Sequence, residues 1–403
     1  MRVLQIIPAI SPVYGGPSQM VRGLSQALAT AGAEVTILTT TANGDSGQPP
    51  LTVPLNQPVA VDNYTVHYFR CIPRGRYKFS PGLLTWLWRH GPTYDIAHIH
   101  ALFSPVSTAA ATVARRQGLP YVLRPLGTLD PADLAKKSQL KRLYGDWLER
   151  PNIAGAAALH FTSPLEAERA QRFGTRCSDV VIPVGVTPLP ALAMAERNSI
   201  LAALGIPQDH PIVLYLSRLD PKKGLDLLLP ALDQLAAEGL PFHFVLAGSN
   251  SQDPVYADDI VHRLAASSLG DRTTCTGFVT GPTKAALLQS AALFVLPSYY
   301  ENFGIAVAEA MIAALPVVIS QRVDLWPAVA AAEAGWTCGL TQLDLVDTLR
   351  QALKNPTLRH IRGQNAQAYA VCHYNWTAIA QRTLTVYHQL LAANSLMPPE
   401  ELH

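Results

Sequence analysis

Short apolar runs alternate with helical stretches along the whole chain. Each apolar run is bounded by turn residues, which is typical of a strand buried on both faces of a sheet. Helices supply the crossovers between parallel strands, so this alternation predicts parallel sheets covered by helices on both faces. In the first half the predicted strands are 3–7, 34–39, 66–69, 95–100, 121–124, 156–161 and 180–182, the predicted helices are 18–31, 83–89, 108–117 and 132–150, and a long loop is predicted over 41–55.

The alternation starts again after 183–190, a segment rich in Pro, Gly and Thr that is typical of a linker between domains. The chain has 403 residues, too many for one hydrophobic core. We therefore expect an α/β fold of two Rossmann-like doubly wound domains, which bind ligands in a cleft between the carboxyl ends of their strands. The second series has predicted strands at 212–216, 242–247, 273–275, 293–296 and 317–319, and the expected domains are 1–187 and 188–375, followed by a terminal helix at 376–403.

Composition narrows the class of protein. The residues are 49% hydrophobic and 15% charged, with a formal net charge of +2, which argues against a general nucleic-acid binder. The five cysteines are scattered and form no CxxC pair, which fits reduced thiols in a cytosol. No apolar run approaches the ~18 residues of a membrane-spanning helix, and the N-terminus does not resemble a signal peptide. We expect a cytoplasmic protein.

Glu301 and Glu309 are the most informative residues of the chain. They follow the predicted strand at 293–296, with seven residues between them, and Gly304 begins an Ala-rich helical stretch. Glu301 should lie on the loop at the carboxyl end of the strand, and Glu309 about a turn inside the helix. Unpaired N–H groups and a positive dipole favour an anion at the helix start. A carboxylate on each side of such a site suits a nucleotide sugar, and the residues expected to line it between the glutamates are Asn302, Phe303, Gly304 and Ile305.

This segment resembles the E-x7-E motif of the retaining GT-B glycosyltransferases of family 4, also called glycosyl transferases group 1. The resemblance covers nearly the whole chain and is strongest over 212–320. It implies that Glu301 contacts the sugar of the donor, that Glu309 holds the ribose hydroxyls, and that the terminal helix crosses back onto the first domain. The alternative is a pair of glutamates that only complements the helix dipole.

Arg218 and Lys223 lie in a second motif, directly after the predicted strand at 212–216. The segment resembles the family's G-R-L-x-x-x-K-G, with Ser217 in place of the first glycine. A leaving nucleoside diphosphate gains negative charge as the glycosidic bond breaks, and two fixed cations stabilise that charge in place of a metal. The alternative is two solvated cations on a surface loop.

Two turns at strand ends complete the expected donor site. The resemblance places Gly248 in a nucleotide pocket lined by backbone, and places Phe278 and Val279 against the base. The chain has no Asp-x-Asp, the motif that holds a divalent cation in the other large glycosyltransferase fold. We therefore expect neither a metal nor another cofactor.

The first domain is expected to face the acceptor. Gly15 and Gly16 permit a tight turn between the first strand and the first helix, and the resemblance places this loop near the donor phosphates and the acceptor. His98 and His100 share one face of the strand at 95–100 because side chains alternate along a strand. His100 is nearer the carboxyl end, and the resemblance places it beside the transferred sugar.

Arg124 and Asp130 belong to a loop that leaves the strand at 121–124. The resemblance associates this loop with the acceptor in a subset of the family. Arg124 is then expected to bind an acceptor phosphate, and Asp130 acceptor hydroxyls. The alternative for Arg124 is an ion pair with a local carboxylate.

Two stretches combine basic residues with tryptophan. Such stretches either form a solvated helix face or lie against an anionic membrane surface, which would make the protein peripheral at the inner face of the membrane. Their residues are Arg70, Arg74, Arg76, Lys78, Trp86, Trp88 and Arg89 in one, and Lys136, Lys137, Lys141, Arg142 and Trp147 in the other.

Together these patterns predict a metal-independent retaining glycosyltransferase of the hexosyltransferase class. Its donor is expected to be a UDP- or GDP-sugar, and its acceptor a saccharide or a lipid-linked molecule, as in polysaccharide biosynthesis. The alternatives are a sugar-nucleotide epimerase, which shares the architecture, and a non-catalytic sugar-nucleotide-binding protein. The sequence does not determine the sugar, the linkage or the oligomeric state.

Overall fold

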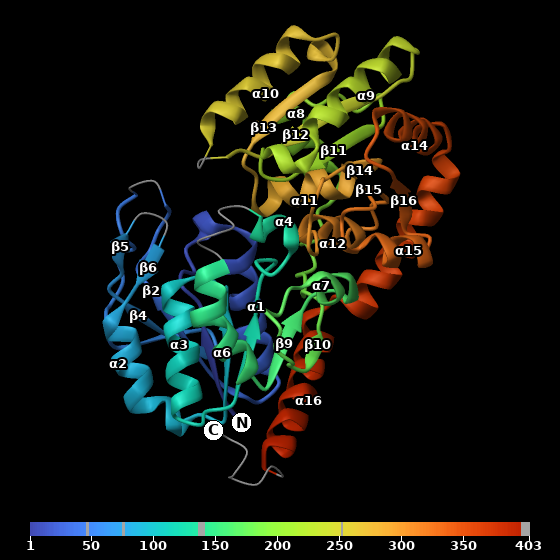
Figure 1. The fold of residues 1–403 in the computed structure, drawn as a ribbon. Helices are drawn as coiled ribbons and strands as arrows, with labels where there is room; N and C mark the ends of the chain where they lie inside the picture. The colour runs from blue at the N-terminus through green and yellow to red at the C-terminus, as the bar shows by residue number, and fades with distance from the viewer. Residues whose placement is uncertain (46–47, 75–76, 136–141, 251–252, 396–403) are drawn as a thin grey trace. The chain divides into compact units, whose positions relative to one another are not determined.

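The chain folds into two compact units, each a mainly parallel sheet covered by helices (Figure 1). The computed structural model describes residues 1–45, 48–74, 77–135, 142–250 and 253–395. Unit 1 comprises Met1–Gly185 and Trp376–His403, and unit 2 comprises Val186–Asn375. The terminal helix α16 (Trp376–Ser395) thus belongs to the same unit as the N-terminal half of the chain.

Unit 1 is built on an eight-stranded sheet with the order β10-β9-β8-β7-β1-β2-β4-β3. All neighbours are parallel except β3 and β4. The direction of winding reverses between β1 and β7, so ligand sites of this fold class are expected at the carboxyl ends of those two strands. The strands are β1 Arg2–Ile6, β2 Glu34–Thr40, β3 Pro58–Val61, β4 Tyr64–Phe69, β7 Ile96–His100, β8 Tyr121–Arg124, β9 Ala158–Phe161 and β10 Asp179–Val181, with a separate hairpin of β5 Ile72–Arg74 and β6 Tyr77–Phe79.

The two faces of this sheet differ in polarity. Ile99 and Leu123 belong to an apolar core that also contains residues of α2, α3 and α6. Alternation along the strands turns Gln5 and His98 to the opposite face. Helices α1 and α16 lie side by side in this unit (Figure 1). The other elements of unit 1 are α1 Gly16–Thr30, α2 Pro81–His90, α3 Pro105–Arg116, α4 Pro131–Leu134, α6 Arg150–Ala154, α7 Pro164–Arg169 and the short turns η1 Pro12–Tyr14, η2 Gly91–Thr93 and η3 Gly145–Glu149.

Unit 2 has a six-stranded parallel sheet with the order β13-β12-β11-β14-β15-β16. The winding reverses between β11 and β14, which makes their carboxyl ends the expected ligand edge. Its strands are β11 Ile212–Leu216, β12 His243–Ala247, β13 Thr273–Gly277, β14 Leu293–Leu296, β15 Val317–Ser320 and β16 Gly335–Cys338. Its helices are α8 Met194–Ala203, α9 Leu225–Ala237, α10 Pro254–Ala266, α11 Gly281–Ser290, α12 Ile305–Ile312, α13 Trp326–Ala331, α14 Gln342–Lys354 and α15 Pro356–His373, with short turns η4 Pro221–Lys223 and η5 Gly270–Arg272.

The predicted helix over 132–150 is wrong as a continuous element. Helix α4 ends at Leu134, residues 136–141 lie outside the described chain, and η3 is a π-helical turn. A Cβ on Gly145 would collide with the ring of Phe173, and the π turn directs Glu149 inward. The Glu149 carboxylate accepts hydrogen bonds from the Phe103 N–H and the Thr108 hydroxyl, both at 2.7 Å. The described interruption is the turn at Ala135, and over 142–154 the chain is helical again, with these contacts accompanying one π turn within it.

Strands β3, β5, β6 and β16 are absent from the sequence prediction. They are short or lack a continuous apolar run, so the pattern used to find strands does not detect them. No helix within the described ranges is both long enough and apolar enough to cross a bilayer.

Candidate functional site

Lys223 and Glu301 meet at the point where the winding of unit 2 reverses. Lys223 ends η4, just after β11, and Glu301 follows β14, the strand hydrogen-bonded beside β11. The Lys223 ammonium forms an ion pair with the Glu301 carboxylate, and their side chains are 9% and 21% exposed. One residue from each predicted motif therefore lies at the expected ligand edge.

The backbone around this pair is fixed by close contacts. Gly224 has a φ of 75°, and a Cβ there would collide with the carbonyl of Pro297, so this position requires glycine. The Tyr299 N–H donates to the Lys222 carbonyl at 2.8 Å. Glu301 is held on both sides, because its N–H donates to the Arg322 carbonyl at 3.1 Å and its carbonyl accepts from Asp324 at 2.9 Å. These hydrogen bonds join the loop after β11 to the loop after β14 and hold the backbone beneath the ion pair.

Burial lowers the pKa of Lys223 to about 7, and the neighbouring cations Lys222 and Arg218 act in the same direction. Asp220 opposes this shift, because an opposite charge favours the ammonium form. A cation held in this way gains most from an added negative charge, and a diphosphate supplies one.

Arg218 lies beside this pair in the loop after β11. Its side chain is exposed, and among the described residues no acidic group pairs with it. The loop is held by Asn250, whose amide donates to the Leu219 carbonyl at 3.0 Å. Gly248 allows the end of β12 to lie against the start of this loop, because a Cβ at Gly248 would collide with the carbonyl of Ser217. The Arg218 guanidinium is thus free to contact a ligand at the same strand edge.

Glu309 lies inside α12, as predicted, and its carboxylate pairs with Lys284 of α11. The Lys284 Nζ to Glu309 Oε1 distance is 2.6 Å, and the side chains are 18% and 14% exposed. Sequence reasoning missed Lys284. The signal that could have found it is a cation in the segment between the predicted strands at 273–275 and 293–296, near the start of what the structure shows to be α11, where the dipole disfavours positive charge.

The start of α12 has the conformation expected for an anion site. Gly304 is its N-cap with a φ of 82°, and no acceptor among the described residues contacts the N–H groups of Phe303, Gly304 or Ile305. Phe303 packs inward against Tyr374, with ring centroids 5.3 Å apart. The Phe303 ring is therefore packed inward, while its N–H has no acceptor among the described residues; its predicted contact with a ligand stays a prediction.

The turn after β13 presents the residues predicted to face a nucleotide base. Phe278 is 74% exposed, which leaves its ring open to stacking. Val279 is half-buried beside it. The Gly248 N–H donates to the Gly277 carbonyl at 2.8 Å and ties this turn to the end of β12. The predicted contacts with the base stay predictions.

In unit 1, Gly15 is the N-cap of α1, with a φ of 66°, and Gly16 is the first residue of the helix. Tyr14 fixes the preceding turn, because its hydroxyl accepts from the Gly44 N–H at 2.7 Å. Asp45 and Lys78 form an ion pair at 2.8 Å, with the Lys78 Nζ 4.7 Å from the centre of the Tyr14 ring. The start of α1 therefore lies next to an ordered polar cluster.

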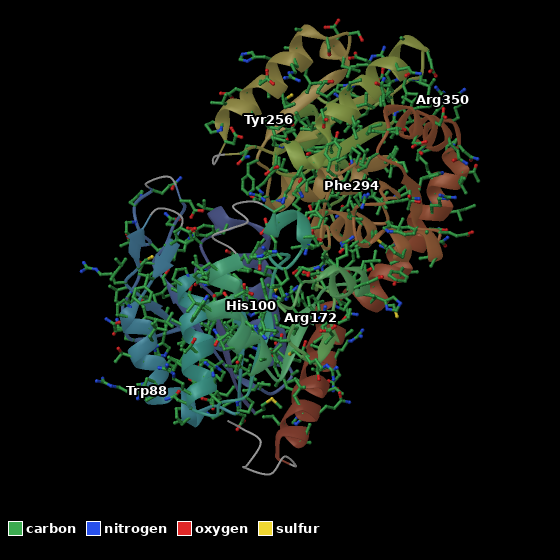
Figure 2. The ribbon with its side chains drawn as sticks, in the orientation of Figure 1. Trp88, His100, Arg172, Tyr256, Phe294 and Arg350 are labelled. Atoms are coloured by element: carbon green, nitrogen blue, oxygen red, sulfur yellow. The ribbon has the colours of Figure 1, made fainter. Side chains whose placement is uncertain are left out.

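His98 and His100 share one face of β7, which confirms the predicted alternation, and their ring centroids are 4.5 Å apart. Both side chains are fully buried, so His100 lies in the interior of unit 1 (Figure 2). Burial is the first cause that lowers the pKa of each ring well below its usual value, and the nearby Arg124 guanidinium acts in the same direction. Both rings are therefore neutral near pH 7.

A directed chain of hydrogen bonds runs through this buried face. His160 donates from Nε2 to the Ile182 carbonyl at 2.8 Å, so in its neutral form its Nδ1 accepts from His98 at 3.1 Å. His98 Nδ1 then accepts from the Tyr387 hydroxyl at 2.7 Å. The Gln5 amide donates to that hydroxyl at 3.4 Å, and its Oε1 accepts from His100 Nε2 at 2.7 Å.

The predicted contact between His100 and a bound sugar stays a prediction. Its Nε2 is occupied by Gln5, and its Nδ1 contacts no partner in the described chain but is enclosed. In this conformation a sugar does not reach the ring.

Arg124 and Asp130 are placed more deeply than their predicted roles imply. Arg124 is buried at the end of β8, where a guanidinium nitrogen lies 2.7 Å from the Met20 sulfur. Burial lowers the pKa of Arg124 to about 10, with Glu166 opposing. Asp130 forms an ion pair with Arg169 of α7 at 3.4 Å. Their predicted contacts with an acceptor stay predictions.

The two basic and aromatic stretches divide into exposed and packed residues. Trp88 projects outward on α2 (Figure 2), and Trp147 is also exposed. Trp86 instead packs against His90 and His67, with ring centroids 4.5 and 4.8 Å apart. The predicted membrane contact stays a prediction, and four of its basic residues lie outside the described chain: Arg76, Lys136, Lys137 and Lys141.

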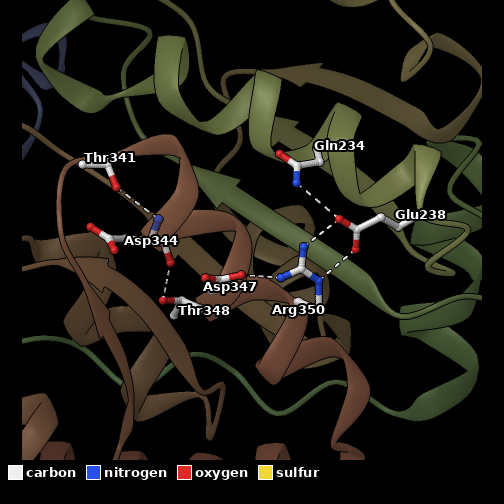
Figure 3. Close-up of polar contacts among 7 residues, drawn as sticks. All are labelled: Gln234, Glu238, Thr341, Asp344, Asp347, Thr348 and Arg350. Atoms are coloured by element: carbon white, nitrogen blue, oxygen red, sulfur yellow. Dashed lines mark hydrogen bonds and ion pairs between the residues drawn. The ribbon is translucent and has the colours of Figure 1, made fainter.

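An ion pair alone does not mark a site. Arg350 binds Glu238 through two nitrogens at 2.6 and 2.8 Å and also contacts Asp347, but this network lies on the exposed surface of α9 and α14 (Figure 3). It is away from the carboxyl ends of the strands. Across the described ranges, no three His, Cys, Asp or Glu side chains lie close enough to hold a metal ion.

Two family descriptions match successive parts of the chain. Residues 15–185 match the glycosyl transferase 4-like domain, and residues 196–369 match the glycosyl transferases group 1. A phosphatidyl-myo-inositol mannosyltransferase of Mycobacterium leprae is 25% identical, over 98% of each chain. A D-inositol 3-phosphate glycosyltransferase of Arthrobacter is 27% identical, over 93% of this chain and 90% of that protein.

Solved structures show the same fold. Sucrose-phosphate synthase from Thermosynechococcus elongatus has a TM-score of 0.77 and 23% identity, covering 98% of this chain and 100% of that chain. The Anabaena protein HepE in complex with UDP-glucose has a TM-score of 0.73 and 18% identity, covering 96% of this chain and 100% of that chain. The predicted fold class, two Rossmann-like domains of the GT-B type, is confirmed.

Proposed function

Because the chain belongs to the glycosyl transferases of group 1, we propose that it moves a sugar from a nucleoside diphosphate to an acceptor hydroxyl with retention of configuration and without a metal. The observation that carries the proposal is the contact between Lys223 and Glu301. In a nucleotide-sugar donor, a single bond joins the sugar to the diphosphate. A cation for the phosphate and a carboxylate for the sugar must therefore be neighbours, and these two are.

The remaining donor contacts follow from the same edge of unit 2. Arg218, exposed beside Lys223, supplies a second cation for the diphosphate. The N–H groups at the start of α12 supply further hydrogen-bond donors to the ligand. Glu309 accepts hydrogen bonds from the ribose hydroxyls. Phe278 stacks on the base. Gly15 and Gly16 at the start of α1 are the proposed contact of unit 1 with the phosphates.

The proposed chemistry is a front-face substitution. The bond between the anomeric carbon and the diphosphate oxygen breaks, and the acceptor oxygen bonds to the same face of that carbon. The acceptor proton passes to the leaving phosphate oxygen. Lys223 and Arg218 stabilise the charge that develops on the diphosphate, so the protein contributes positioning and electrostatics.

The donor and acceptor classes are proposed from the comparisons. HepE is described in complex with UDP-glucose, which supports a UDP-sugar here, with a GDP-sugar as the second choice. Relatives are described as acting on phosphatidyl-myo-inositol and on D-inositol 3-phosphate. These names support a polyhydroxylated acceptor, either free or lipid-linked.

The test has three stages. A thermal-shift screen with UDP, GDP, ADP, TDP and their sugars should identify one nucleotide series that raises the melting temperature. Transfer is then measured with that donor in excess EDTA, where activity should persist. Proton NMR of fresh product should show the donor's anomeric configuration.

Each stage has an outcome that contradicts part of the proposal. Loss of activity in EDTA that Mg²⁺ or Mn²⁺ restores would show that a metal supplies the charge. A β-linked product from an α-linked donor would overturn the mechanism. Binding of a sugar nucleotide without hydrolysis or transfer to any acceptor would favour the non-catalytic alternative.

A further inference from the structure

Lys284 contacts a proposed ligand-binding residue, although no motif includes it. It lies near the start of α11, the helix that follows the turn with Phe278 and Val279. Its ammonium reaches Glu309 of α12 at 2.6 Å. Lys284 therefore joins the element proposed to hold the base to the element proposed to hold the ribose.

The position of Lys284 is unfavourable without a partner. A cation near the N-terminus of a helix is repelled by the helix dipole. The Lys284 side chain is also only 18% exposed, so water does not fully solvate it. Glu309 removes both costs, since an opposite charge stabilises a partly buried ion.

Glu309 gains equally from the contact. Its side chain is 14% exposed, and a partly buried carboxylate is stabilised by an opposite charge. The contact also holds the Glu309 side chain in one rotamer. Only Oε1 is engaged, and among the described residues no donor contacts Oε2. One oxygen is thus anchored while the other stays available to hydroxyl groups.

We propose that Lys284 is a positioning residue for the nucleotide: it holds the Glu309 carboxylate oriented so that Oε2 accepts hydrogen bonds from hydroxyls of the donor ribose. This inference rests on the proposed role of Glu309. It makes Lys284 a determinant of ribonucleotide over deoxyribonucleotide recognition, acting through Glu309 rather than by its own contact with the ligand.

The experiment compares the affinities of UDP and 2′-deoxy-UDP, and of GDP and 2′-deoxy-GDP, measured by titration calorimetry with the full chain. The variants are Lys284→Ala, Lys284→Arg, Glu309→Gln and the double variant Lys284→Ala/Glu309→Gln. Arg350→Ala, which breaks an exposed ion pair in the same unit, is the matched control. Circular dichroism and melting temperature verify that each variant is folded.

The wild-type protein should prefer the ribonucleotide by about tenfold or more, the effect of a hydrogen bond to a charged group. Glu309→Gln should abolish that preference. Lys284→Ala should reduce it several-fold, Lys284→Arg should restore most of it, and Lys284→Ala should change nothing further once Glu309 is replaced. A structural role alone would lower the melting temperature and leave the ribose preference intact.

Different failures identify different errors. If Glu309→Gln removes the preference and Lys284→Ala does not, the role of Lys284 is wrong while the proposed site stands. If nucleotides bind and Glu309→Gln leaves the preference unchanged, the ribose assignment in the proposed function is wrong. Tighter binding by Lys284→Ala would show that the lysine competes with ribose, and equal losses in both Glu309 backgrounds would show direct contact; either overturns the inference.

Discussion

The two units share a winding pattern, yet their central strand ends differ in polarity and burial. At the β11–β14 edge of unit 2, Lys223 and Glu301 are charged and remain partly exposed. On the β1–β7 face of unit 1, His98 and His100 are neutral and enclosed, with Tyr387 of α16 over them. The same topology thus supports either an edge open to a ligand or a closed polar layer.

The physical difference lies in what satisfies each polar group. In unit 1 most of the buried side-chain groups bond to one another or to the backbone in a single directed chain of hydrogen bonds, and His100 Nδ1 is the enclosed atom of that chain without a partner among the described residues. In unit 2 a depressed Lys223 pKa and an exposed, unpaired Arg218 leave positive charge that an anion can satisfy. We therefore expect changes in unit 2 to affect activity first, and changes in the polar layer of unit 1 to affect stability first.

The largest effect is expected from removing a cation of unit 2. Lys223→Ala should lower turnover about 100-fold, and Arg218→Ala at least about tenfold, by analogy with the loss of one donor to a developing oxyanion. Steady-state rates with the sugar nucleotide found by the thermal-shift screen measure this. Near-native circular dichroism is the control, and turnover close to that of the wild type in both variants would refute the phosphate assignment.

The pH dependence should show a second, smaller effect. Lys223 has a pKa of about 7, so in the free protein it is charged below that pH and neutral above it. The kcat/KM should therefore fall as pH rises above about 7, approaching tenfold per pH unit, whereas an ordinary lysine would hold its charge to about pH 10. The diphosphate diester of the donor has no ionisation in this range.

Lys223→Arg separates this titration from others. Arginine stays charged throughout, so the alkaline fall should move to higher pH or disappear, even if the rate at neutral pH is lower. An unchanged fall in the arginine variant would assign it to a different group.

Tyr387→Phe tests the closed layer of unit 1. The change removes the hydroxyl that bridges Gln5 and His98 and leaves two buried groups unsatisfied. The free energy of unfolding should drop by about 1–3 kcal/mol, while turnover per folded molecule changes less than in the unit 2 variants. Urea denaturation measures the free energy of unfolding, and steady-state kinetics measure the turnover. Full stability with strongly reduced turnover would place this layer in the catalytic machinery.

The smallest effect is expected from Arg350→Ala. Its contacts with Glu238 and Asp347 lie on the surface, where water screens the charges (Figure 3). Turnover and nucleotide affinity should match the wild type, and the melting temperature should change least among the variants. A loss of affinity here would mean that ion pairing in general, rather than pairing at the strand edge, supports binding.

Most of the regular elements follow from sequence patterns, and the exceptions have specific causes. The apolar strands at the centre of both sheets were predicted because their runs are continuous. Strand β16 was not, because its residues, Gly335–Cys338, include glycine and threonine and form no apolar run. The helix expected over 132–150 is interrupted at Ala135, which lies in a turn. At Gly145 the chain stays helical but takes a π turn, where Phe173 packs and Glu149 is drawn inward by groups from the segment around α3.

The candidate site divides in the same way. Glu301, Glu309, Arg218 and Lys223 were found because each belongs to a short motif at a predicted strand end. The alternation correctly placed His98 and His100 on one face of β7. It did not show that His100 is buried. A strand pattern gives the face of a side chain; it does not reveal that α16 packs on that face.

By itself, the sequence determined the alternation of strands and helices, the glycines that turn the chain, and the motifs that carry charge, because these depend on residues close together along the chain. Only the tertiary structure decided which charges meet. Lys223 and Glu301 are 78 positions apart, Lys284 and Glu309 are 25 apart, and His98 and Tyr387 are 289 apart. Strand order and helix packing bring these groups together, and their burial then sets how strongly each charge or hydrogen bond acts.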